Sequence, residues 1–241
     1  MIDVHFHCLP GIDDGPADWD QAVALCRAAA DEGTTTIVAT PHVLRGAWLN
    51  EDRRARRALV DELNAKLGGS PRVVEGCEYF FSGDAVELWE LGDEGPLTAI
   101  NNGTCLLVEF PATILPSSAE AVLFELALKG VRPLIAHPER NLVLAVEPEK
   151  LRRFIDLGAL AQITAGSILG RFGAGAARAA AEMLKLGLVA VVASDAHSPR
   201  HPPELRAARE RVTRQFGAAV AERLFEVNPG ELLLTTATPR S

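Results

Sequence analysis

Short apolar runs rich in β-branched residues alternate with stretches of helical periodicity along the chain, and this alternation limits the fold more than any other feature. Each run has the length of a buried strand, and most of the segments between them are long enough for a helix that returns to the same sheet. The expected strands span residues 1–5, 34–40, 72–78, 105–109, 132–136, 159–164 and 189–193. Seven such units favour an α/β fold with a parallel sheet.

The expected helices cover residues 18–32, 51–67, 119–129, 148–157, 174–186 and 203–226. In the first of these, Trp19 and Val23 share one helical face, and Asp18 is the expected N-cap. The 241 residues contain no linker or low-complexity break, so we expect a single domain over residues 1–241 with a frayed tail from about residue 235. An open doubly wound sheet is an alternative, but the length fits a closed barrel better.

The charge balance argues against several classes of partner. With 24 Lys and Arg against 32 Asp and Glu, the formal net charge is −8, so no overall positive field attracts nucleic acid or an anionic membrane. No apolar run is long enough for a transmembrane segment, and the N-terminus lacks the pattern of a signal peptide. We therefore expect a cytoplasmic protein whose four cysteines are free thiols.

Five of the six histidines and three acidic residues stand at or just beyond the carboxyl ends of expected strands. They are His5, His7, His42, Glu78, Glu109, His137, Asp195 and His197. The carboxyl ends of barrel strands meet on one face, and neutral imidazoles and carboxylates are the ligands expected for Zn, Mn or Fe. Asp14, in the loop after the first strand, is a further acidic candidate. We expect these side chains to form one metal site.

Several motifs resemble those of the PHP superfamily, named after polymerases and histidinol phosphatases. They are MIDVHFHCLPGIDDGP, ATPH, AHPER and SDAH, together with the strand ends Glu78 and Glu109. More narrowly, the chain is similar over residues 1–228 to the capsule- and exopolysaccharide-associated bacterial branch, the metal-dependent protein tyrosine phosphatases. The resemblance implies a distorted, TIM-like (β/α)7 barrel of seven strands, which agrees with the strand count.

The resemblance also implies three divalent metal ions, of which Mn²⁺ is the expected one, with Fe or Zn as alternatives at one or more positions. Its ligand pattern assigns His5, His7, Glu78 and Asp195 to one ion, Glu78, Glu109 and His137 to a second, and Asp14, His42 and His197 to a third. Such a loaded site has a net charge of about +2, which suits a phosphate monoester dianion. We expect a hydroxide that bridges two ions to attack phosphorus in line.

Arginines next to the metal motifs are candidates for catalysis. Arg140 is the expected bidentate phosphate clamp, with a salt bridge to Glu139 or to another nearby acid as the structural alternative. The family carries Arg-Pro-Pro after its last metal motif, whereas this chain reads Arg200-His201-Pro-Pro. Either Arg200 reaches the phosphate by a shifted path, or His201 assists as a cation or an acid. Further substrate-binding candidates are Trp48, Phe80 and Phe81 for a phosphotyrosine ring, and Asn141 for phosphate.

These motifs predict a manganese-dependent phosphatase that acts on phosphotyrosine in proteins, and the resemblance implies the tyrosine-rich tail of a capsule- or exopolysaccharide-synthesis kinase as its partner. A phosphatase of small metabolites such as histidinol phosphate is one alternative, and a non-enzymatic metal-bound interaction domain is another. An amidohydrolase is disfavoured because strand six carries Gln162 and Thr164 instead of a histidine. The acidic balance disfavours a DNA exonuclease, and the sequence leaves the oligomeric state open.

Overall fold

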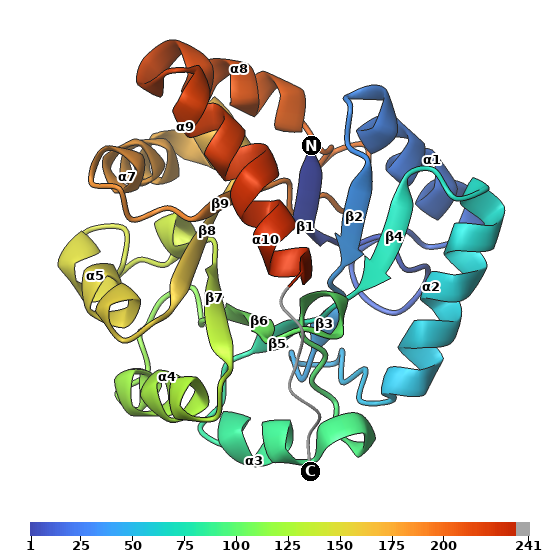
Figure 1. Ribbon diagram of the computed structural model, residues 1–241, viewed down its shortest axis with the longest axis horizontal. Coiled ribbons are helices and arrows are strands. Elements are labelled where there is room, and N and C mark those ends of the chain that lie inside the picture. The colour runs from blue at the N-terminus through green and yellow to red at the C-terminus, as the bar shows by residue number, and fades with distance from the viewer. Residues whose placement is uncertain (235–241) are drawn as a thin grey trace.

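The computed structural model describes residues 1–234 and has an α/β architecture in which neighbouring strands of each sheet run parallel (Figure 1). A three-stranded sheet has the order β1 (Ile2–Phe6), β2 (Thr36–Ala39) and β4 (Arg72–Glu75). A six-stranded sheet has the order β3 (His42–Val43), β5 (Glu78–Phe80), β6 (Cys105–Glu109), β7 (Arg132–Ala136), β8 (Leu160–Thr164) and β9 (Val191–Ala193). The expected parallel α/β fold is confirmed.

The chain passes from one sheet to the other at two places, just beyond the second expected strand and inside the third. The second expected strand ends at Ala39, and β3 begins after Pro41, whose ring leaves no N–H for a sheet ladder. The third expected strand is interrupted at Gly76, where a Cβ would lie 2.7 Å from Cγ1 of Val38. The strands therefore lie in two sheets, of three and six strands, so the structure supports the parallel α/β fold but not yet the exact seven-stranded barrel.

Helices surround the strands (Figure 1), with bounds close to those expected. They are α1 (Trp19–Asp31), α2 (Arg53–Leu67), α3 (Ala85–Glu90), α4 (Ala119–Leu128), α5 (Pro148–Asp156), α6 (Ala165–Leu169), α7 (Gly173–Lys185), α8 (Leu205–Phe216), α9 (Ala218–Glu222) and α10 (Asn228–Leu234). The Asp18 side chain caps α1 by accepting from the N–H of Gln21. No helix in the described part of the chain has the length and apolar character needed to cross a membrane.

Shorter turns complete the chain, namely the 3-10 turns η1 (Gly92–Glu94), η2 (Ile100–Asn102) and η3 (Pro138–Arg140) and the π-helical turn η4 (Arg223–Val227). All four cysteines are buried free thiols, as expected. The tail from residue 235, for which the sequence predicted fraying, lies outside the described residues.

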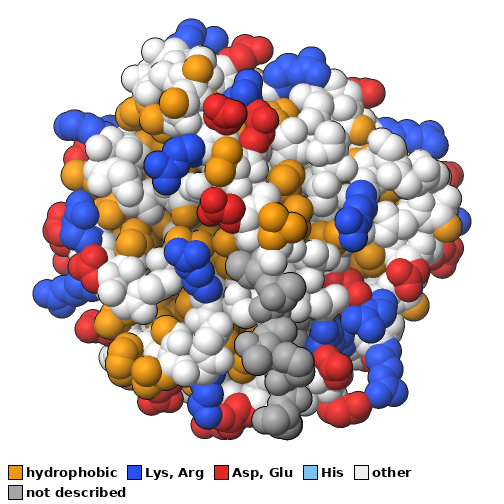
Figure 2. All heavy atoms as spheres, in the orientation of Figure 1, with side chains coloured by type: hydrophobic (Ala, Val, Ile, Leu, Met, Phe, Trp, Pro, Cys, Tyr) orange, Lys and Arg blue, Asp and Glu red, His pale blue; other side chains and the backbone are white. Residues whose placement is uncertain are grey.

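The alternation of side chains along the strands divides the core into an outer and an inner layer. On β6, Leu106 and Val108 pack with the helices, whereas Cys105 and Leu107 join an inner apolar cluster. Leu232 of α10 belongs to this inner cluster, and α10 crosses the strands on the side shown in Figure 1. Figure 2 shows the same side, and no histidine is visible on it. The polar strand ends therefore lie away from this face.

Candidate metal centre

Unusual backbone geometry at two strand ends directs polar side chains into one cavity. His137 and Asp195 have φ values of 32° and 56°, in the left-handed region that non-glycine residues rarely adopt and that is common at functional sites. Ala136 belongs to the inner cluster, so strand alternation alone would point His137 outward. The left-handed backbone instead brings its Nε2 to 3.0 Å from Oε1 of Glu78.

Glu78, at the start of β5, is fully surrounded by imidazoles. Its carboxylate oxygens lie 2.8 Å from Nδ1 of His42, 3.0 Å from Nε2 of His137, 3.3 Å from Nε2 of His5 and 3.4 Å from Nε2 of His7. Burial alone would raise the pKa of Glu78, but the neighbouring imidazoles outweigh it and hold the pKa well below the ordinary value. Glu78 therefore stays ionised at the centre of the cluster.

Asp14 joins two further imidazoles at the mouth of the cavity. Its Oδ1 lies 3.3 Å from Nε2 of His42 and 3.2 Å from Nε2 of His197, and the His197 ring stacks on His7 with ring centres 3.8 Å apart. Burial opposes the charge of Asp14, but hydrogen bonds from His197 and His42 lower its pKa well below the ordinary value. His7, Asp14, His42 and His197 each place a ligand atom within 4.8 Å of the others.

Three more groups of ligand atoms meet the same distance limit. They are His5, His137 and Asp195; His5, His7 and Glu78; and His42, Glu78 and Glu109. The structure thus brings all nine sequence-predicted ligand residues into one connected cluster. The groups do not coincide with the family pattern: His137 groups with His5 and Asp195, His7 joins Asp14, His42 and His197, and His42 and His137 lie 3.9 Å and 4.0 Å from the Glu109 carboxylate.

Three buried polar atoms of the cluster make no hydrogen bond. Nδ1 of His42 and Oε2 of Glu78 are 2.8 Å apart without the alignment of a hydrogen bond, and Oε2 of Glu109 forms none although Nε of Arg45 lies 2.8 Å from it. Burial and the neighbouring Glu78 carboxylate raise the pKa of Glu109 to about 7, against the opposing effect of Arg45. A bound divalent cation would relieve both conditions, and the imidazole and carboxylate donors fit such an ion.

Two side chains outside the predicted set orient the imidazoles. Oδ2 of Asp13 lies 2.8 Å from Nδ1 of His7, and Oε1 of Gln162 lies 2.9 Å from Nδ1 of His5. These contacts leave Nε2 of both histidines facing the cluster, as happens where the second ring nitrogen of a metal ligand is held by a neighbour. The repeated acid of the Asp13-Asp14 pair was a signal for such a role, whereas nothing in the sequence pattern marked Gln162 for it.

Arg140 faces the cavity and contacts a predicted ligand residue. Its Nη1 donates to Oδ2 of Asp195 at 2.6 Å, and not to Glu139, whose carboxylate accepts from Ser167 and from the N–H of Thr164. The cavity above the cluster has a volume of 280 Å³. The structure therefore places Arg140 beside the cluster, where it forms a salt bridge with a nearby acid, Asp195, and not with Glu139.

Arg45 also lines the cavity, and the sequence reasoning missed it. Its Nε lies 2.8 Å from Oε2 of Glu109, and its Nη1 lies 2.7 Å from Nε2 of His42. A tight turn presents it, because Arg45 and Trp48 exchange two backbone hydrogen bonds, and the Trp48 ring stacks on His42 with centres 5.2 Å apart. No strand end or motif spacing marks a residue in such a loop, so the sequence carried no signal for it.

The two candidates next to the last metal motif lie in different environments. Arg200 is exposed and is not among the residues that line the cavity. His201 does line it, and its ring stacks on His197 with centres 5.1 Å apart. Burial lowers the pKa of His201 to about 4, so the ring is neutral near pH 7 and does not provide the cation that the sequence suggested. Arg45, and not Arg200, therefore lines the cavity.

Of the remaining substrate-binding candidates, only Trp48 stands next to the cluster. Phe81 is buried and packs on Phe110 with ring centres 5.0 Å apart, and Phe80 is half-buried and does not line the cavity. The Asn141 side chain is buried, and it bonds the backbone of Pro111, Ile114, Val143 and Leu144. Phe81 and Asn141 thus stabilise the core and a loop, and they do not face a substrate.

The fold and the cluster define a class, a parallel α/β protein with a candidate metal centre at the carboxyl ends of its strands. A sequence model of the family described as capsular polysaccharide synthesis, CpsB/CapC, matches residues 1–234. The chain belongs to this family, which confirms the resemblance drawn from the motifs.

Relatives and solved structures agree with this assignment. Tyrosine-protein phosphatase YwqE of Bacillus subtilis is 36% identical over 99% of this chain and 93% of its own length, and tyrosine-protein phosphatase CpsB of Streptococcus pneumoniae is 28% identical over 97% and 98%. A solved structure, described among those of YwqE and CpsB as metal-dependent tyrosine phosphatases, matches with a TM-score of 0.91, 34% identity and coverage of 98% and 96%. An organophosphorus hydrolase of Deinococcus radiodurans, at 15% identity and a TM-score of 0.62 over 96% and 92%, shares the fold alone.

Proposed function

We propose that this chain is a metal-dependent phosphatase that hydrolyses phosphotyrosine in proteins. One observation carries the proposal: nine imidazole and carboxylate side chains form one cluster, and seven of them line a single cavity together with Arg45 and Arg140. Relatives that are named tyrosine-protein phosphatases support the same conclusion.

The proposal assigns three divalent ions, Mn²⁺ in the first place, to the cluster. Asp14, His42 and His197 would hold one ion, His5, His7, Glu78 and Asp195 a second, and Glu78, Glu109 and His137 a third. When bound, such ions supply a Lewis acid for the phosphoryl oxygens and lower the pKa of a water molecule to about 7. The contacts of Glu78 with four imidazoles support its assignment to two ions.

The two arginines would hold the ester phosphate. Arg45 contacts Glu109 and His42, and Arg140 contacts Asp195, so ions that take these ligands would free both guanidinium groups toward the mouth of the cavity. A planar guanidinium matches two phosphoryl oxygens at once. A tyrosine phenolate has a conjugate-acid pKa of about 10, so it leaves with less help from an acid than an alkoxide needs.

The finer fold and the partner belong to the same proposal. The two sheets form one distorted seven-stranded barrel and one domain, which the parallel bridge between Phe6 of β1 and Ala196 beyond β9 supports. The polysaccharide-synthesis family supports a capsule- or exopolysaccharide-synthesis kinase, met in the cytoplasm through its tyrosine-rich tail, as the substrate.

The test compares hydrolysis of a phosphotyrosine peptide with that of histidinol phosphate, by protein stripped with a chelator and then reloaded with Mn²⁺. We expect turnover to return with Mn²⁺ and to favour the peptide. A preference for histidinol phosphate would assign the site to a small metabolite. Absence of turnover on both substrates in protein with full metal content would instead indicate a metal-bound interaction domain.

A further inference from the structure

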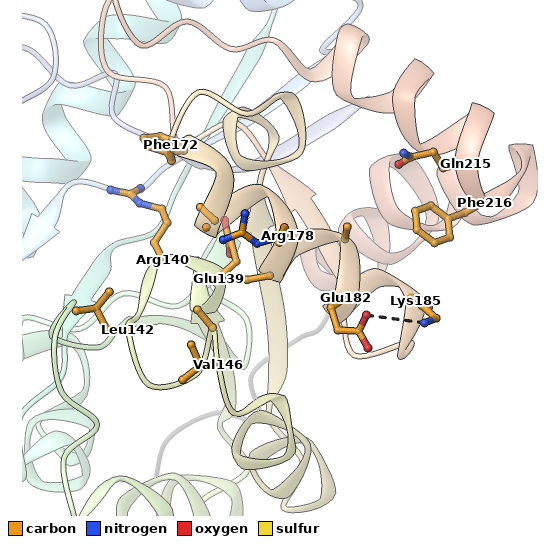
Figure 3. Close-up of a pocket in the computed structure, with 15 residues that line it drawn as sticks. Glu139, Arg140, Leu142, Val146, Phe172, Arg178, Glu182, Lys185, Gln215 and Phe216 are labelled. Atoms are coloured by element: carbon orange, nitrogen blue, oxygen red, sulfur yellow. Dashed lines mark ion pairs between the residues drawn. The ribbon is translucent and has the colours of Figure 1, made fainter.

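A second hollow adjoins the metal cavity and is much larger, with a volume of 1090 Å³ against 280 Å³. It is a groove between the loop that follows η3, one side of α7 and the end of α8 (Figure 3). Figure 3 shows Arg140 and Phe172 at one end of the groove, and Glu182, Lys185 and Phe216 toward the other. The metal chemistry uses none of these residues except Arg140.

Small residues on α7 create the groove. Gly175, Ala176 and Ala179 line it, and a Cβ added at Gly175 would meet no atom within 4 Å. On the opposite wall, Leu142 and Val146 expose 64% and 75% of their surface. Apolar side chains this exposed and gathered along one hollow are typical of a surface that binds a partner.

The groove is continuous with the metal cavity through one residue pair. Arg140 lines both hollows, and its guanidinium lies 4.4 Å from the centre of the Phe172 ring. Phe172 also contacts the edge of His201, which lines the metal cavity, with ring centres 5.1 Å apart. A bound polypeptide that places a phosphorylated side chain beside Arg140 would therefore place the residues adjacent to it in the groove.

The charge of the groove favours an acidic occupant. Lys185 lies 3.9 Å from Glu182, whereas Arg178 is exposed and forms no ion pair with any acidic residue of the described chain. Arg178 is therefore a cation on the groove wall without a carboxylate partner in the described chain, although the protein as a whole carries a net charge of −8. Such a cation attracts a carboxylate on a bound partner.

We propose that this groove binds the polypeptide segment that flanks the phosphotyrosine, with an apolar side chain against α7 and an acidic side chain beside Arg178. The inference rests on the proposed function and specifies its substrate. The metal cavity has room for one phosphorylated aromatic side chain, so the neighbouring residues of a protein substrate lie outside it. The groove supplies an apolar wall and a cation at the place where those residues emerge.

The test measures kcat/KM of Mn²⁺-loaded protein on p-nitrophenyl phosphate and on three phosphotyrosine peptides, whose flanking residues are apolar and acidic, apolar and basic, or glycine and serine. Gly175→Leu fills the groove, and we expect kcat/KM on the apolar-acidic peptide to fall about tenfold or more, the range for blocking a side-chain pocket. Turnover of p-nitrophenyl phosphate should stay within about twofold, since this compound has no flanking residues.

Charge reversal provides a second, independent variant at an exposed position. Arg178→Glu should lower kcat/KM on the apolar-acidic peptide about fivefold, as expected for a partly exposed ion pair, and should raise it on the apolar-basic peptide. Ala65→Leu is the matched control, because Ala65 is exposed on α2, across the strands from α7 in Figure 1. This control variant should have the same kcat/KM as wild type on all four substrates.

Three outcomes would overturn the inference. In the first, wild type would have the same kcat/KM on all three peptides. In the second, both groove variants would have the same kcat/KM as the control variant on every peptide and would hydrolyse p-nitrophenyl phosphate normally. Alternatively, the groove variants could dissociate an oligomer without changing peptide kinetics, which would assign the groove to a second copy of the chain. Failure of Mn²⁺-loaded wild type on p-nitrophenyl phosphate and all peptides would instead contradict the proposed function itself.

Discussion

The two ends of the strand-enclosed interior differ in what fills them, although the same strands supply both. Toward the amino ends, Val4, Leu107, Leu134 and Leu232 form an apolar cluster. At the carboxyl ends, imidazoles and carboxylates occupy buried positions except for Asp14 at the mouth, and Glu109 stands only one inward position beyond Leu107. This difference shows that one end stabilises the fold through apolar burial, whereas the other end keeps buried charge for chemistry.

The largest expected effect comes from a substitution at the polar end of the interior. Glu78→Gln removes the carboxylate that four imidazoles share, and we expect kcat/KM on an aryl phosphate to fall by about a thousandfold or more, because metal Lewis-acid catalysis contributes several kcal/mol. Elemental analysis should find less Mn²⁺ per chain. Glu75→Gln is the control, because Glu75 pairs with Arg57 at 2.6 Å outside the cluster. Full metal content and turnover in Glu78→Gln would contradict the proposed centre.

At the apolar end, Leu107→Ala should produce the opposite pattern. Loss of this fully buried side chain leaves a cavity and should lower the free energy of unfolding by about 2–5 kcal/mol in denaturant titrations. Metal content per folded chain should not change. Leu128→Ala, at a side chain that is 70% exposed, should change the free energy of unfolding by less than about 0.5 kcal/mol. Loss of metal together with stability in Leu107→Ala would show that the two ends are not independent.

Arg45 tests how the polar end recognises phosphate. Arg45→Ala should weaken binding of inorganic phosphate to Mn²⁺-loaded protein about tenfold or more, the range for losing a charged hydrogen-bond donor, by calorimetry. Arg200→Ala is the matched control, since Arg200 is exposed and does not line the cavity. Equal phosphate affinities of the two variants would remove Arg45 from the phosphate site.

The sequence predicted the residues of the site better than it predicted the arrangement of the sheets, because the site residues follow from local patterns along the chain. The candidate ligands His5, Glu109 and Asp195 stand at or just beyond the ends of apolar runs, so their positions followed from that pattern. Arg45 depends instead on a turn closed by Trp48 and cannot be found from periodicity. Phe81 looked like a rim residue because it follows Glu78 closely, but an aromatic pair with Phe110 holds it in the core.

The sequence indicated one of the two points at which the chain passes between the sheets, but not the other. Pro41 lies just beyond the second expected strand and separates β2 from β3, because it donates no hydrogen bond. At Gly76 the cause is the close approach of Val38 from another strand, which would lie only 2.7 Å from a Cβ at this position. Such a contact exists only once the strands are packed, and long-range packing of this kind is what a single sequence does not reveal.

The smallest expected effect concerns His201, which stands between the polar cluster and the groove. Burial lowers its pKa in the folded protein from 6.5 to about 4, and His197 and Arg140 act in the same direction against Asp195. Between pH 4 and 6.5 the folded state therefore binds fewer protons than the unfolded state, so the free energy of unfolding rises with pH across this window.

His201→Gln removes this single titration while every other group stays. In chelator, the free energy of unfolding of the variant minus that of wild type should grow as pH falls from 6.5 and level off near pH 4. The effect is small because part of the ring faces solvent, which screens its interactions. Urea titrations at intervals across this range measure it, and a constant difference would mean that the ring keeps an ordinary pKa. His201 would then carry positive charge into the cavity at mildly acidic pH, and the polar end would hold a third cation beside Arg45 and Arg140.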